Sequence, residues 1–157
     1  MERLSFVPSP IGLLGLAEES GRLTRLFFAR ERIGREDSAD ESPLLRRVAA
    51  QLDEYFKGER SSFDLPLAPR GTDFQRAVWD ALLAIPYGET TSYKAVAERV
   101  GNPAACRAVG MANNRNPIAV IIPCHRVVGS NGSLTGYAAG LPAKQLLLDL
   151  ERRYRPG

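Results

Sequence analysis

Residues 63–70, Phe-Asp-Leu-Pro-Leu-Ala-Pro-Arg, separate two parts of the chain that differ in their sequence patterns. The two prolines of this segment fix φ and lack amide donors, and the segment has no helical period, so it is suited to an extended connector. We therefore predict a domain boundary here, with an N-terminal domain over residues 1–65, a linker over 66–71 and a C-terminal domain over 72–157.

The first 30 residues predict three short strands. Apolar runs at 4–7, 13–17 and 23–28 are separated by turn residues, which is typical of an antiparallel meander. Residues 30–42 are rich in charge and have no apolar period, so we expect an exposed loop there.

One helix is expected to pack on this sheet. Ser42 is suited to cap it, Pro43 to occupy its first position and Gly58 to end it. Its apolar residues form one stripe at helical spacing, and such a stripe more often packs on a core than in a partner's groove. The stripe consists of Leu44, Leu45, Val48, Leu52, Tyr55 and Phe56.

The C-terminal part begins with a helical pattern. Thr72 and Gln75 match a capping box, and apolar residues follow at spacings of three and four as far as Ile85. The sequence Pro-Tyr-Gly that comes next breaks the helix.

Two further short helices follow, separated by a glycine. Ser92 is suited to cap a helix over 93–100, and Gly101 ends it. Asn102, with a proline directly after it, predicts a second helix over 103–113. The spacing is that of a helix-turn-helix motif, although the pattern alone has many false positives.

The second helix of this pair is unusual for its small side chains. Ala105, Cys106, Ala108 and Gly110 surround one long cationic residue, Arg107. Small residues allow a helix to come close to another surface, which fits either tight helix packing or insertion into a groove of DNA.

Positive charge is concentrated in the C-terminal part. Residues 1–71 hold 11 Lys and Arg against 12 Asp and Glu, a net charge of −1, whereas residues 72–157 hold 10 against 6, a net charge of +4. An anionic partner such as nucleic acid would be attracted there, and a plain solvated basic face is the alternative.

The composition and the N-terminal sequence argue against several other classes of protein. Apolar residues at 44% and charged residues at 25% describe an ordinary globular protein, and no apolar run approaches the roughly 18 residues of a membrane span. The N-terminus lacks a signal-peptide pattern, so we expect a cytoplasmic protein. Two cysteines and one histidine indicate neither a disulfide framework nor a zinc site, and we expect no cofactor.

The candidate chemistry lies in residues 121–128, Ile-Ile-Pro-Cys-His-Arg-Val-Val. Cys124 follows an apolar segment at 118–122, and His125 could activate its thiol. Neighbours on an extended chain point to opposite sides, so a water relay between the two is plausible, with Asp149 or Glu151 as the acceptor that orients the imidazole. A buried structural cysteine is the alternative.

The end of the chain supplies a loop and a helix. Residues 135–140 have small side chains around Tyr137 and could lie close to a ligand. Pro142 opens a last helix whose inward residues we expect to be Leu146, Leu147 and Leu150.

The sequence resembles the O6-alkylguanine-DNA alkyltransferases, also called methylated-DNA–protein-cysteine methyltransferases. The resemblance spans roughly residues 72–153. It is carried by Pro-Cys-His-Arg-Val at 123–127, Arg-Ala-Val-Gly at 107–110, Asn-Pro at 116–117, Gly-Tyr at 136–137, and Leu-Leu at 147–148 with Glu151.

The resemblance implies an α/β fold, more closely α+β. The N-terminal domain would be ribonuclease H-like, a small antiparallel sheet with a packed helix. The C-terminal domain would be mostly helical with a winged-helix-like helix-turn-helix.

The resemblance also implies roles for the site residues. Cys124 would accept the alkyl group, His125 would act as base through a water, Glu151 would orient it, and Asn116 would order the turn. Tyr93 would contact the flipped nucleotide and help to protonate the departing guanine.

The implied partner is double-stranded DNA containing alkylated guanine, approached from the minor groove by a monomer that could cluster cooperatively. Arg107 would fill the vacancy left by the flipped base. Further contacts would come from the small helix residues and from Ser92, Lys94, Arg115 and Arg126. Tyr137, Ala138, Gly140 and Lys144 would form the alkylguanine pocket.

Each protein molecule would act once, because nothing in the sequence regenerates the thiol. O4-alkylthymine stays open as a second substrate. A lesion binder without transfer activity, a thiol hydrolase unrelated to DNA and a transcriptional regulator are the alternative functions.

Overall fold

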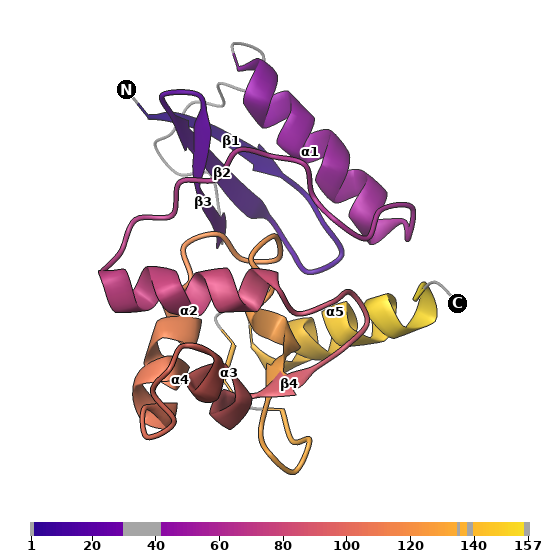
Figure 1. Cartoon of the computed structure of the whole chain (residues 1–157). Helices are drawn as coiled ribbons and strands as arrows, with labels where there is room; N and C mark the ends of the chain where they lie inside the picture. Colours follow the sequence, from indigo (N-terminus) through magenta and orange to yellow (C-terminus); the bar gives the residue numbers. More distant parts are fainter. Residues whose placement is uncertain (1, 30–41, 135, 138–139, 156–157) are drawn as a thin grey trace.

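The computed structural model describes residues 2–29, 42–134, 136–137 and 140–155. A three-stranded sheet and a long helix come first, and the rest of the chain is mainly helical (Figure 1). The predicted charged loop at 30–42 lies, except for Ser42, outside the described residues, and so does Ala138.

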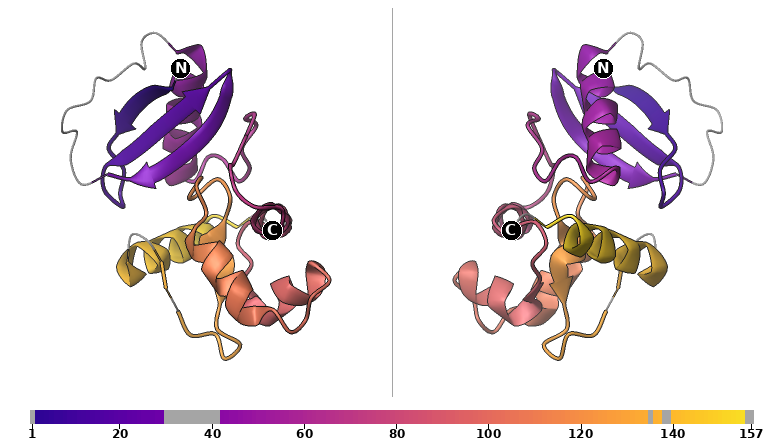
Figure 2. Two further views of the ribbon diagram at one scale, coloured as in Figure 1. Left: turned by 90° about the vertical axis from the view of Figure 1, so that its left-hand side faces the viewer. Right: turned by 90° about the vertical axis from the view of Figure 1, so that its right-hand side faces the viewer.

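The sheet is the predicted antiparallel meander. Strands β1 (Arg3–Val7), β2 (Leu14–Glu19) and β3 (Arg22–Phe28) lie in the order β1-β2-β3, with an irregularity of register at Ala17 and Glu18. Helix α1 (Pro43–Phe56) covers one face of this sheet (Figures 1 and 2).

Helix α1 begins and packs as its sequence predicts. Ser42 Oγ accepts a hydrogen bond from the amide of Leu45 at 3.1 Å, and Gly58 adopts φ +78° just beyond the last turn. The middle of the apolar stripe is buried, while its end residues Leu44 and Phe56 are half-buried. The fully buried members are Leu45, Val48, Leu52 and Tyr55, each at most 2% exposed.

The outer edge of β3 holds two segments from further along the chain. The connector pairs with it at Leu23, whose amide donates to Pro66 O at 2.9 Å and whose carbonyl accepts from Ala68 N at 2.8 Å. Three residues further along, Leu26 donates to Pro117 O at 2.9 Å and accepts from Ala119 N at 3.1 Å. The N-terminal sheet therefore anchors the loop that leads to Cys124.

Three helices form the predicted helix-turn-helix unit. Helices α2 (Asp73–Leu83), α3 (Tyr93–Arg99) and α4 (Cys106–Asn114) pack against one another. The capping box of Thr72 and Gln75 is present at the start of α2, and Ser92 Oγ caps α3 by accepting from Ala95 N at 3.1 Å.

The predicted start of the second helix was wrong. Asn102 closes a turn, in which its carbonyl accepts from Ala105 N at 3.0 Å, and α4 begins only at Cys106. Asn followed by Pro suits a turn as well as a helix start, so the sequence pattern did not distinguish them.

A two-stranded parallel ladder joins the helix-turn-helix to the cysteine segment. Strand β4 (Thr91–Ser92), directly before α3, pairs with β5 (Val127–Val128), directly after the 3-10 turn η2 (Cys124–Arg126). The ladder thereby links the start of α3 to the backbone that follows Cys124.

Helix α5 (Leu141–Arg153) closes the fold. Leu147 and Leu148 are buried on it, whereas the predicted inward residues Leu146 and Leu150 are only half-buried. Lys144 and Glu151 share the buried face, and two charged residues there are the first sign that α5 serves more than packing.

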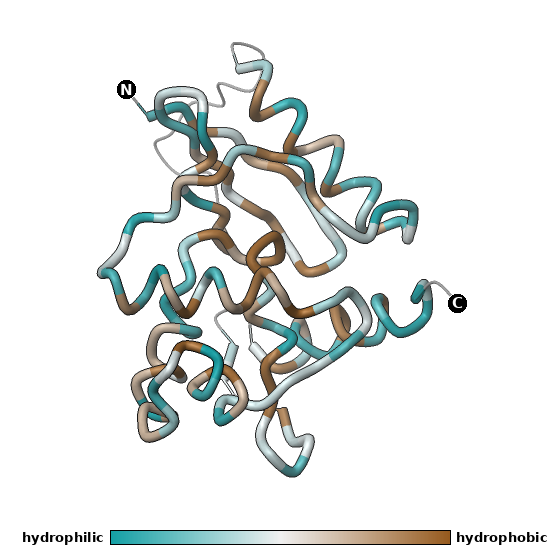
Figure 3. Tube along the Cα trace, viewed as in Figure 1, coloured by the Kyte–Doolittle hydropathy of each residue, from teal (hydrophilic) through white to brown (hydrophobic). Residues whose placement is uncertain are grey.

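The segment before Cys124 is part of the core. Residues 118–122 are all buried, and Figure 3 shows them as a hydrophobic loop between the sheet and α2. Among the described residues, no helix is long and apolar enough to span a membrane.

Candidate active site

Cys124 lies in a tight turn rather than on extended chain. The backbone of Val120 adopts φ +69°, and Cys124 N donates to Ile122 O at 2.8 Å, so the chain folds back on itself before η2. Asn116 holds the two ends of this loop together, since its Oδ1 accepts from Ile118 N at 3.0 Å and its Nδ2 donates to Ile122 O at 2.7 Å. This agrees with the predicted ordering role of Asn116 and corrects the expectation of an extended chain at the cysteine.

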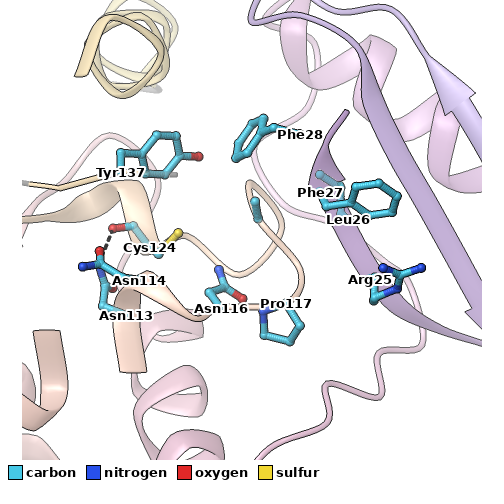
Figure 4. Close-up of a pocket in the computed structure, with 11 residues that line it drawn as sticks. Arg25, Leu26, Phe27, Phe28, Asn113, Asn114, Asn116, Pro117, Cys124 and Tyr137 are labelled. Atoms are coloured by element: carbon cyan, nitrogen blue, oxygen red, sulfur yellow. Dashed lines mark hydrogen bonds between the residues drawn. The ribbon is translucent and has the colours of Figure 1, made fainter. Parts of the chain in front are cut away.

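The thiol opens onto a cavity of about 300 Å³. This volume is at the lower end of the range of about 300–1,000 Å³ that is typical of small-molecule sites. One wall comes from the end of α4, and another comes from strand β3 of the N-terminal sheet (Figure 4). The lining residues labelled in Figure 4 include Asn113, Asn114, Asn116, Tyr137 and Phe28.

Burial makes the resting state of Cys124 a thiol. It raises the pKa of Cys124, while a hydrogen bond from Asn116 and the charge of Lys144 act in the opposite direction. A neutral thiol is a weak nucleophile, so this cysteine needs a base.

His125 is placed to be that base. It is fully buried, and its Nε2 lies 2.7 Å from Glu151 Oε2, which fixes the proton of the neutral ring on Nε2. Its Nδ1 is buried and has no hydrogen-bond partner in the described part of the protein. Burial lowers the pKa of His125 and the carboxylate partly restores it, so the ring rests neutral with Nδ1 free to accept a proton.

Glu151 is the carboxylate that orients the imidazole. Burial alone would raise its pKa, but hydrogen bonds from His125 and Arg126 and the positive charge of Arg126 lower it to about 2. The alternative acceptor, Asp149, is exposed and pairs instead with Gln145 at 2.7 Å. The structure thus selects Glu151 from the two candidates.

The structure places Arg126, which was predicted to contact DNA, inside the site instead. Its side chain is buried, its Nε and Nη2 donate to the two oxygens of Glu151 at 2.8 and 3.0 Å, and its Nη1 donates to Ile85 O at 2.7 Å. A guanidinium used in this way is not available to a phosphate, and here it fixes the carboxylate.

Two predicted pocket residues lie elsewhere. Lys144 is buried and does not line the cavity, and its Nζ donates to Val127 O at 2.7 Å. Gly140 caps α5 with φ +93°, and its amide donates to Tyr137 O at 2.9 Å. Tyr137 does line the cavity, and burial holds its pKa well above 10, so its hydroxyl is a donor.

Unpaired polar atoms gather at this site. Asn113 Oδ1 and Tyr137 Oη are buried and, like His125 Nδ1, have no partner in the described part of the protein. Asn113 and Tyr137 line the cavity, and His125 follows Cys124 in the chain. Buried polar groups are normally paired, so these unpaired atoms indicate that a polar ligand or water completes the site.

The outer face of α4 is exposed, and several of its side chains are small. Cys106, Arg107 and Ala108 are exposed, and Val109 on the opposite face is buried. Tyr93, at the start of α3, is half-buried with its ring close to Gly110. Lys94 and Arg115 are exposed on the same helical unit, while Ser92 is half-buried at its cap and Ala105 lies just before α4.

Several residues at the site were not predicted from the sequence. Asn113 and Phe28 line the cavity, and Tyr55 donates from Oη to Glu151 Oε2 at 2.5 Å. A tyrosine within a buried apolar stripe was the available signal, because a buried hydroxyl requires a partner.

The described residues contain no cluster of His, Cys, Asp and Glu side chains able to hold a metal ion.

Comparison with known proteins gives matches over nearly the whole chain. Residues 73–153 match the DNA-binding domain of 6-O-methylguanine DNA methyltransferase, and residues 3–69 match its ribonuclease-like domain. A methylated-DNA–protein-cysteine methyltransferase of Methanosarcina barkeri is 55% identical, over 92% of this chain and 94% of the relative.

Solved structures agree with these matches. O6-methylguanine methyltransferase of Mycobacterium tuberculosis is 46% identical, with a TM-score of 0.85 over 99% of this chain and 96% of that chain. Mycobacterium tuberculosis OGT in complex with DNA is also 46% identical, with a TM-score of 0.88 over 98% of this chain and 95% of that chain. The chain therefore belongs to the 6-O-methylguanine DNA methyltransferase family.

Proposed function

We propose that this protein repairs DNA directly by moving an alkyl group from O6 of guanine to Sγ of its own Cys124. The observation that carries the proposal is a buried thiol at a cavity, next to a histidine whose Nδ1 is free and whose Nε2 is held by a carboxylate. The family supports the reaction, since its members are named for methyl transfer from DNA to a protein cysteine.

The step needs one base and one acid. His125 Nδ1 takes the thiol proton through a water, and Glu151 stabilises the imidazolium that forms. The thiolate displaces guanine from the alkyl carbon, so that an S–C bond forms as the C–O bond breaks. The electrons of that bond go to the guanine, which is protonated with the help of Tyr93. The product thioether is stable, and each molecule acts once.

Access to the base requires that it leave the duplex. A guanine in the stack is out of reach, and rotating it out costs a few kcal/mol, least for a badly paired lesion. The small exposed face of α4 suits approach through the minor groove, and Arg107 offsets part of the lost stacking. A relative solved in complex with DNA supports DNA as the partner.

The phosphates would be bound by the exposed cations. Lys94 and Arg115 are exposed on the helical unit that carries Arg107. We propose binding as a monomer that can cluster on DNA, in the cytoplasm and on the nucleoid.

Intact-protein mass spectrometry tests the proposal. After incubation with a duplex containing O6-methylguanine, the protein should gain one methyl group on Cys124, and Cys124→Ala should gain none. An unchanged mass despite tight binding would indicate a lesion binder, and a methyl group on another residue would contradict the assignment of Cys124.

A further inference from the structure

The hydroxyl of Tyr55 reaches the carboxylate of the site from the N-terminal domain. Tyr55 lies on α1, 96 residues before Glu151, and Oη donates to Glu151 Oε2 at 2.5 Å. The same oxygen binds His125 Nε2 at 2.7 Å. One oxygen atom therefore connects the N-terminal domain with the base of the reaction.

The direction of the hydrogen bond is fixed. Burial raises the pKa of Tyr55 well above 10, and the charge of Glu151 raises it further, so the phenol keeps its proton. The pKa of Glu151 is lowered to about 2, so the carboxylate has no proton to give. Tyr55 is the donor at every pH at which the protein works.

The ring of Tyr55 has little freedom to turn away. It is fully buried, with the rings of Phe56, Phe63 and Tyr87 at centroid distances of 5.2, 5.4 and 6.3 Å. Tyr87 also lies under the guanidinium of Arg126, with Cζ 5.7 Å from its centroid. The aromatic cluster thus sets the position of the hydroxyl against the carboxylate.

Glu151 Oε2 divides its hydrogen-bonding capacity among three donors, namely Tyr55, His125 and Arg126. Each donor reduces the negative charge that the others meet. A weaker hydrogen bond from His125 Nε2–H to Glu151 lowers the affinity of Nδ1 for a proton, and a stronger hydrogen bond raises it.

We infer that Tyr55 is a positioning residue for the alkyl transfer proposed above, and that its hydroxyl sets the orientation and basicity of His125 through Glu151 Oε2. The inference rests on the proposed function and gives the N-terminal domain a part in the chemistry. The other titratable and charged groups near His125 and Glu151 are Tyr87, Cys124, Arg126, Tyr137 and Lys144.

Tyr55→Phe removes the hydroxyl and keeps the ring. We expect the rate constant of methyl transfer to fall about fivefold to tenfold, because Glu151 loses one of the donors that fix the position from which it orients His125. Glu151 then binds His125 more strongly, so the midpoint of the acid limb of the pH–rate profile should move to higher pH by about 0.5 pH unit. Tyr87→Phe is the matched control, since it removes a hydroxyl from the same cluster but leaves Tyr55 on the carboxylate, and its profile should keep the wild-type midpoint.

Nuclear magnetic resonance gives a readout that is independent of repair. His125 is the only histidine, so its ring signals need no further assignment. In Tyr55→Phe the Nε2 proton should move downfield as its hydrogen bond to Glu151 strengthens, and in Tyr87→Phe it should stay in place. If neither the wild type nor any variant transfers a methyl group, the proposed function fails. The position of the Nε2 proton still tests whether Tyr55 acts on His125 through Glu151.

A second substitution covers the case in which Tyr55→Phe does not fold. 3-Fluorotyrosine at position 55 keeps the ring and makes its hydroxyl a stronger donor, so the Nε2 proton and the acid limb should move in the opposite direction. A loss of rate with an unmoved midpoint and an unmoved Nε2 proton would overturn the inference and reduce Tyr55 to a packing residue.

Discussion

At the scale of single residues, the site depends on one carboxylate. Glu151 accepts hydrogen bonds from Tyr55, His125 and Arg126, with a longer contact of 3.4 Å from Gly88 N. A buried charge is tolerated only when it is paired in this way, and removing the charge leaves its partners unsatisfied. We therefore expect Glu151 to contribute to stability as well as to the proposed activation of Cys124.

Glu151→Gln tests the contribution to stability. Because the folded-state pKa of about 2 lies below the ordinary 4.5, the stabilisation is complete above pH 4.5 and is lost as the pH falls towards 2. We expect the free energy of unfolding to drop by about 3 kcal/mol at pH 7, and the difference from the wild type to shrink between pH 4.5 and 2. Urea unfolding at several pH values measures this.

Asp149→Asn is the control for that series, since it removes an exposed carboxylate two residues away on the same helix. It should change stability by less than about 0.5 kcal/mol at any pH. A constant difference between Glu151→Gln and the wild type from pH 7 to 2 would show that the carboxylate charge is not what stabilises the fold.

At the scale of elements, α4 and the loop before η2 have separate tasks. Helix α4 presents Arg107 on an exposed face of small residues, while its end lines the cavity through Asn113 and Asn114. The ladder of β4 and β5 ties the helix pair to the cysteine turn. Binding at the helix and chemistry at the thiol can therefore be tested apart.

Arg107→Ala should impair repair in duplex DNA more than the reaction with free O6-benzylguanine, because only the duplex requires a base to be flipped. The two rate constants, measured on the same preparation, give the ratio. Arg115→Ala is the comparison variant, and it should weaken DNA binding and reduce the slope of log K against log salt by about 1. Equal losses of rate on both substrates would show that Arg107 has no role in base flipping.

At the scale of the whole molecule, the end of α1 is fixed against the end of α5. Beyond α1, Gly58 adopts φ +78°, and a Cβ there would lie 2.4 Å from the ring of Tyr154. Gly58 lies just after Tyr55, and Tyr154 lies just after Glu151, so this contact and the hydrogen bond between Tyr55 and Glu151 join the same two segments of the chain. The N-terminal domain is thus docked where Glu151 is held.

Gly58→Ala should lower stability through both its backbone and this contact. Gly101→Ala is the control, because Gly101 has a similar φ of +81° but nothing within 4 Å of its would-be Cβ. We expect Gly58→Ala to cost about 1–3 kcal/mol more than Gly101→Ala, since the ring of Tyr154 must move. Thermal unfolding of both variants measures the difference, and equal losses would mean that Tyr154 does not pack on Gly58 in solution.

The sequence predicts the features that depend on local periodicity. The three strands, α1 with its Ser42 cap and the capping box at Thr72 are all confirmed, because neighbouring residues determine them. The start of α4 was wrong because Asn-Pro suits both a turn and a helix start.

Contacts between distant residues could not be predicted in the same way. The burial of Arg126 and the hydrogen bond between Tyr55 and Glu151 depend on how α1, η2 and α5 meet, and no local pattern records that. The left-handed backbone at Val120, which turns the chain before Cys124, is equally invisible in an apolar run.

If Cys124 is consumed in the reaction, the yield of repaired DNA is limited by the amount of protein. With duplex O6-methylguanine in large excess, repaired guanine should rise to one equivalent per protein molecule and then stop, with a spent protein that carries the methyl group on Cys124. Product that continues to accumulate beyond one equivalent would contradict the irreversible transfer to Cys124, because a stable thioether on Cys124 leaves no route to turnover.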